Sequence, residues 1–115
     1  MTDQILSKKI MEMIETGRVA VDYLVSTKTI SNCITLRVAA DLLESLYEIQ
    51  RVYVGFGKSP KKVVQVLQAV IAPFDNLSNA YKNGNQALIY KSVNEIEEQY
   101  EILYNLFFNP DVYIH

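Results

Sequence analysis

Few side chains in this sequence belong to the types that carry common catalytic chemistry. The chain has one cysteine, Cys33, and one histidine, His115, its last residue. A lone cysteine rules out an intramolecular disulfide, and a nucleophilic cysteine needs a nearby base, for which the sequence offers only that terminal histidine. We therefore interpret Cys33 as a small buried apolar residue and expect no catalytic residue and no enzyme. An enzyme that uses Tyr, Lys and Glu groups is an alternative that would require a polar cleft.

Acidic side chains gather near the C-terminus, at Glu95, Glu97, Glu98 and Glu101. A di-metal site in a helical bundle requires inward-facing glutamates together with Glu-x-x-His pairs, and the sequence contains no such pair. On a helical wheel, Glu98 and Glu101 point away from the apolar positions of this segment. We predict a solvated acidic face, with no metal and no cofactor.

The segment Gly57-Lys58-Ser59 resembles the end of a phosphate-binding loop. That motif needs a glycine five residues before Gly57, where this chain has Val52, and it needs a preceding strand. Lys58, Lys61 and Lys62 form a local basic cluster, but the net charge is −2, too little basic charge for a dedicated nucleic-acid protein. We interpret this segment as a linker and expect no nucleic-acid partner.

The positions of glycine and proline divide the chain into four segments whose apolar residues recur every three or four residues, as in amphipathic helices. The predicted breaks are at 26–32, 55–60 and 83–85. The third helix is expected over about 60–82, after a Ser59-Pro60 start, and the fourth over about 86–108, after Asn85 as its cap. Pro73 lacks an N–H group, so the third helix should kink there or divide at Ala72.

We predict a single all-α domain over residues 1–115, an antiparallel up-down-up-down four-helix bundle built from two helical hairpins, with the third helix kinked at Pro73. Half of the residues are apolar, enough to form a core. The longest apolar stretch, 63–74, is too short to cross a membrane, and the N-terminus does not resemble a secretory signal. We therefore expect a cytoplasmic protein with no membrane partner.

The second and fourth helices carry more apolar surface than is needed for one seam, the row of apolar residues along the face of a helix that packs on the core. The second helix has an additional stripe that includes Leu36, Leu43, Tyr47 and Val54, and the fourth has Ile102 and Leu106 away from its seam. One interpretation is that neighbouring helices of the bundle fill these stripes. The other is that they are exposed and bind a partner, which the eight tyrosines favour because interfaces are enriched in tyrosine.

These observations predict a non-catalytic protein-protein interaction module of the adaptor, chaperone or inhibitor type, whose partner is another protein or a second copy in a homodimer. The predicted binding residues are Leu36, Leu43, Tyr47, Val54, Tyr90, Ile102, Tyr104, Leu106 and Tyr113. The alternative is a sensor for a small ligand, with an apolar pocket between helices where Pro73 kinks the third helix and Gly17 thins the first. The apolar tail after Pro110 could dock on its own bundle or on another subunit.

Overall fold

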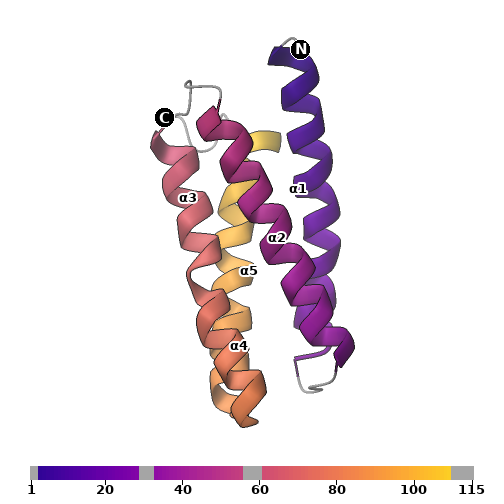
Figure 1. Ribbon diagram of the computed structural model, residues 1–115, viewed down its shortest axis with the longest axis vertical. Helices are drawn as coiled ribbons and strands as arrows, with labels where there is room; N and C mark the ends of the chain where they lie inside the picture. Colours follow the sequence, from indigo (N-terminus) through magenta and orange to yellow (C-terminus); the bar gives the residue numbers. More distant parts are fainter. Residues whose placement is uncertain (1–2, 29–32, 56–60, 110–115) are drawn as a thin grey trace.

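The computed structural model of this protein describes residues 3–28, 33–55 and 61–109. These residues form five helices and no strand: α1 (Asp3–Ser26), α2 (Cys33–Gly55), α3 (Lys61–Ile71), α4 (Pro73–Asn83) and α5 (Gln86–Phe108). Figure 1 shows that α4 continues the course of α3, so the described residues make a bundle of four rods. The predicted all-helical bundle is confirmed.

Each rod packs against two others. α2 and α5 both contact α1, and both contact the rod formed by α3 and α4. α2 and α5 therefore occupy diagonal corners of the bundle. α1 and α5 run in opposite directions, because Tyr100 of α5 bonds to Ile14 in the middle of α1, whereas Gln86 at the start of α5 donates to the carbonyl oxygen of Lys28, just beyond the end of α1, at 2.7 Å.

The third rod is divided at Ala72, one of the two outcomes expected from Pro73. Pro73 occupies the first turn of α4 and has no N–H group, so the regular hydrogen-bond ladder stops there. Ala72 keeps helical dihedral angles (φ −53°, ψ −44°) and still donates to the carbonyl oxygen of Gln68 at 2.9 Å. The backbone thus passes through the break without leaving the helical region.

The turn between α4 and α5 follows the predicted end signals. Gly84 ends α4 in the left-handed conformation (φ 62°), which glycine adopts without steric cost. The side chain of Asn85 accepts a 3.2 Å hydrogen bond from the backbone N–H of Leu88 and caps α5. The Ser59-Pro60 start predicted for the third helix lies outside the described residues.

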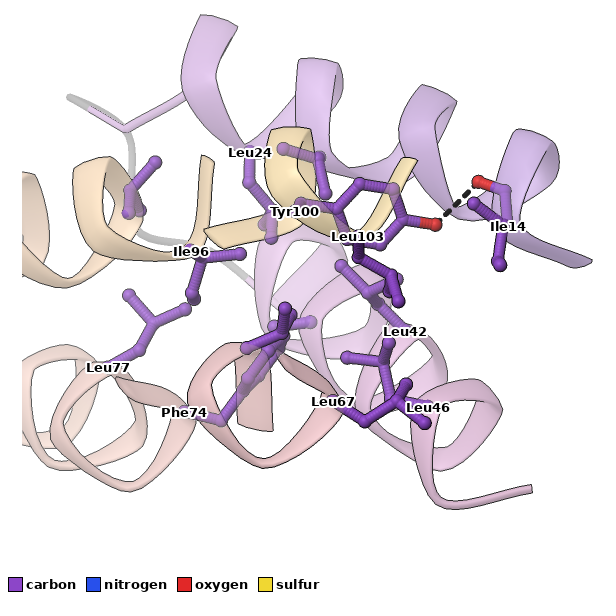
Figure 2. Packing of buried hydrophobic residues seen from close by; sticks show 14 of the residues in the cluster. Ile14, Leu24, Leu42, Leu46, Leu67, Phe74, Leu77, Ile96, Tyr100 and Leu103 are labelled. Carbon is purple, nitrogen blue, oxygen red and sulfur yellow. Dashed lines mark hydrogen bonds between the residues drawn. The ribbon is translucent and has the colours of Figure 1, made fainter. Parts of the chain in front are cut away.

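The core runs along the centre of the bundle and draws on all five helices (Figure 2). Its largest fully buried side chains include Leu24, Leu46, Leu67, Leu77 and Leu103. On α1, Ile14 and Leu24 are fully buried, whereas Met13 is only partly buried against the core. Ile14 lies four residues from Ile10 and seven from Val21, so it belongs to the face of α1 that meets α5.

Candidate functional site

The additional stripe predicted on α2 lies on the flank that faces α3 and α4. Leu36 and Tyr47 are exposed, at 42% and 48% of their full surface, whereas Leu43 is partly buried against the core. Leu36 also lines a small cleft of about 90 Å³, whose other walls include Phe74, Leu77 and Tyr81 of α4. Neighbouring helices therefore cover this stripe in part and leave Leu36 and Tyr47 open to solvent.

The predicted residues of α5 are engaged within the chain. The ring of Tyr104 stacks on Phe108 with centroids 4.3 Å apart, and the guanidinium of Arg18 lies 4.2 Å from the centre of the same ring. Tyr90 is approached by the ammonium group of Lys28 at 5.3 Å. Ile102 and Leu106 are partly buried and pack against the core.

The nine predicted binding residues do not share one surface. Those on α2 and those on α5 lie on helices at diagonal corners of the bundle. The side chain of Val54 and the whole of Tyr113 lie outside what the structure describes, as does the side chain of Cys33. Of the predicted residues that are described, Leu36 and Tyr47 are the two classed as exposed.

A shallow groove lies between α1 and α2 beside Gly17, and none of the predicted binding residues lines it. Its volume is about 540 Å³, it is open to solvent, and most of its lining surface is apolar. We call it the α1/α2 groove. It is lined by Thr16, Gly17, Val19, Ala20, Tyr23, Val38, Asp41, Leu42 and Ser45.

Val19 is the most exposed large apolar side chain of the described residues, with 69% of its surface accessible. Ile34, at the start of α2, is 59% exposed. Both residues lie off the apolar seams of their helices. The sequence signal for this surface is a large apolar residue that lies off the apolar seam of its own helix, whether or not it belongs to a complete second stripe.

A second hollow of about 400 Å³ continues the groove toward the N-terminal half of α1. Thr16 and Ser45 line both hollows, so the two are contiguous. The second hollow adds Lys9, Glu12 and Met13 to the lining. The combined surface is therefore apolar at the Val19 end and charged at the Glu12 end.

The position of α1 beside the groove depends on a close contact behind it. The hydroxyl of Tyr100 reaches from α5 to α1 and donates a 2.5 Å hydrogen bond to the carbonyl oxygen of Ile14 (Figure 2). A Cβ atom at Gly17 would overlap that hydroxyl and would lie 3.2 Å from Leu42 of α2. Gly17 thus lets α5 and α2 approach the same point of α1.

Charged groups at the groove are mostly unpaired. Among the described residues, ion pairs join Arg18 to Glu101 at 3.8 Å and Arg51 to Glu48. Glu12, Asp41 and Arg37 are exposed, and the described part of the chain gives them no hydrogen bond or ion pair. These three side chains are therefore available to charges on another molecule.

Two buried tyrosines have perturbed hydroxyl groups. Burial raises the pKa of Tyr100 well above its ordinary value, and the nearby Arg18 charge offsets only part of this effect. Burial also raises the pKa of Tyr81, with a smaller contribution from Tyr23. The Tyr81 hydroxyl has no hydrogen-bond partner among the described residues. Both groups are neutral at physiological pH.

The pocket proposed at the level of Pro73 and Gly17 is not one continuous cavity. A hollow of about 240 Å³ at Pro73 is lined by residues of α3, α4 and α5, including Glu95 and Gln99. It shares no lining residue with the α1/α2 groove at Gly17. The groove is the more apolar of the two and has the volume of a small-molecule site, but its open shape would leave much of a small ligand in solvent.

Two further features bear on the kind of site present. Within the described segments, no three His, Cys, Asp or Glu side chains come together as they would around a metal ion. None of the helices over those same segments has the length and apolar character of a membrane span.

The fold and the groove define an all-helical four-rod bundle with an open apolar surface on its first two helices. No family model, no curated protein and no solved structure matches the chain.

Proposed function

We propose that this protein is a non-catalytic protein-protein interaction module, of the adaptor, chaperone or inhibitor type, that binds its partner through the α1–α2 hairpin. The observation that carries the proposal is the distribution of exposed apolar side chains. All four of the large ones in the described residues lie on this hairpin: Val19 on α1, and Ile34, Leu36 and Tyr47 on α2.

The physical reason is the cost of leaving such surface in water. Covering the exposed part of Val19 alone is worth about 1 kcal/mol, and Ile34 and Tyr47 add contributions of similar size. The charged residues around the groove would form the polar rim that surrounds the apolar centre of most protein interfaces. We place the protein in the cytoplasm as part of the same proposal, because its single cysteine suits a reducing compartment.

Site-specific photo-crosslinking in the cell of origin tests this proposal and can capture a partner whose identity is not known beforehand. Benzoylphenylalanine is placed at position 19 or 47, and at position 98 as a matched control, because Glu98 is exposed on α5 away from the hairpin. We expect discrete protein adducts from position 19 or 47 and none from position 98. Equal labelling at all three positions, or at none, would contradict the proposal.

The second candidate function is a small-ligand sensor, favoured by the apolar α1/α2 groove of about 540 Å³ beside Gly17. Anilinonaphthalene sulfonate can serve as the probe, because its fluorescence rises in apolar sites. Saturable one-to-one binding that Ala20→Trp abolishes would favour a ligand site, since the indole would fill the groove that Ala20 lines. Weak binding that does not saturate would favour the protein-binding function.

A further inference from the structure

We propose that the partner of the α1/α2 groove is a second copy of this chain, packed groove against groove about a twofold axis beside Val19. This inference rests on the proposed function and names the partner of the same surface. In a twofold interface each contact between two different residues occurs twice, so a self-complementary surface must carry matching groups on opposite sides of the axis.

Val19 supplies the centre of such an interface. It is the most exposed large apolar side chain described, and it stands in the lining of the groove beside Ala20 and Val38. On a twofold axis it would contact Val19 of the second copy. Each copy would then cover the apolar lining of the other, which a single bundle leaves open to solvent.

Charge complementarity supplies the second argument. Glu12 lies seven residues before Val19 on α1, about 10 Å along the helix, at the Ser45 end of the groove. Arg37 lies on α2 one turn before Asp41, next to Val38 and hence toward the Tyr23 end of the groove. The two opposite charges therefore lie on opposite sides of Val19 and on different helices.

A twofold axis beside Val19 carries Glu12 of one copy toward Arg37 of the other, and the reverse. Both side chains are exposed, and neither has an ion pair among the described residues. Two such pairs at the rim would fix the register of the dimer, that is, the position of one copy relative to the other. They would add little to its affinity, because exposed ion pairs are individually weak. The apolar centre would provide most of the affinity.

Sedimentation equilibrium over a concentration series, at low salt, tests the proposal. We expect a monomer–dimer equilibrium for the unmodified chain. Val19→Glu should raise the dissociation constant by at least about 100-fold, because it places two carboxylates together at the axis. Circular dichroism and urea unfolding of each variant verify that the bundle remains folded.

A charge exchange tests the register. Glu12→Arg and Arg37→Glu should each weaken the dimer by roughly tenfold, because each creates two like-charge contacts, and the double variant should restore the dissociation constant to within about threefold. Glu98→Arg is the matched control and should have no effect. Two single variants without effect, or a double variant without rescue, would overturn the proposed register.

Tyr47→Glu distinguishes this surface from the other flank of α2. Dissociation by Tyr47→Glu, with Val19→Glu inert, would overturn the inference and move the contact to the flank that faces α3 and α4. An unmodified chain that stays monomeric at all concentrations would also overturn it. In that case, crosslinking of a different protein from position 19 would show that the proposed function still holds.

Discussion

The hydroxyl of Tyr100 on α5 donates a 2.5 Å hydrogen bond to the carbonyl oxygen of Ile14 on α1, 86 positions away in the sequence. Tyr100 is almost fully buried, and its hydroxyl fits because Gly17 has no Cβ atom. This bond joins the first and last helices at the level where α1 also meets Leu42 of α2. It thereby determines how closely the first rod approaches the rest of the bundle.

Gly17→Ala should lower the free energy of unfolding by about 1–3 kcal/mol, measured by urea denaturation. The added methyl group would overlap the Tyr100 hydroxyl and crowd Leu42, and this cost should exceed the gain of about 1 kcal/mol in helix propensity. In a Tyr100→Phe background the overlapping oxygen is absent, so the cost of Gly17→Ala should be smaller. Equal costs in both backgrounds would show that the hydroxyl is not the source of the strain.

Tyr100→Phe should change the stability in alkaline solution. Burial raises the pKa of the Tyr100 hydroxyl, so above about pH 10 the unfolded chain loses this proton while the folded chain keeps it. The free energy of unfolding of the unmodified chain should therefore be unaffected by this group below about pH 10. Above it, the free energy should fall by up to about 1.4 kcal/mol per pH unit.

Urea denaturation between about pH 8 and 11 measures this slope. Tyr100→Phe should cost about 1 kcal/mol at neutral pH, through the lost hydrogen bond, and should flatten the alkaline slope. A residual slope is expected from Tyr81, whose pKa burial also raises. A slope that Tyr100→Phe leaves unchanged would contradict the assignment.

Asn85→Ala should lower the free energy of unfolding by about 1 kcal/mol, because the N–H group of Leu88 loses its side-chain acceptor at the start of α5. The control is Asn79→Ala, an exposed change inside α4, for which we expect no loss. Thermal unfolding followed by circular dichroism suffices for the comparison. A similar loss from both substitutions would argue against a capping role for Asn85.

Arg18 and Tyr104 should be energetically coupled across α1 and α5. A double-mutant cycle with Arg18→Ala and Tyr104→Ala should give a coupling energy of about 0.5–1 kcal/mol, from the guanidinium placed over the ring. The parallel cycle of Arg18→Ala with Glu101→Gln should give less, because both partners of that ion pair are largely exposed. A larger coupling energy for Arg18 with Glu101 than for Arg18 with Tyr104 would mean that the ion pair, rather than the ring contact, positions Arg18.

Val19→Glu should leave the stability of the folded bundle within about 0.5 kcal/mol of the unmodified chain when both are measured as monomers, because Val19 makes little contact with the core. Val21→Glu provides the contrast. That side chain is almost fully buried, and a carboxylate there should prevent folding. A large loss from Val19→Glu would mean that Val19 supports the fold, and its use as an interface probe would then fail.

Local signals are sufficient for much of the fold. The three- and four-residue spacing of apolar side chains predicts the helices. Gly84 and Asn85 predict the turn between α4 and α5 correctly, because the conformation of that turn depends on those residues alone. Pro73 predicts the break between α3 and α4 for the same reason. Met13 and Ile14 both fit an apolar period, and how deeply each is buried depends on how α1 is rotated toward α5.

The candidate site depended on information that is not local. The sequence alone determined that the chain is helical and has more apolar surface than one seam needs. Only the tertiary structure decided which of that surface remains open, because Tyr104 is covered by Arg18 from a helix distant in sequence, whereas Val19 faces a gap between α1 and α2. Helical period fixes the face of a residue on its own helix, but the exposure of that face is set by the packing of neighbouring helices.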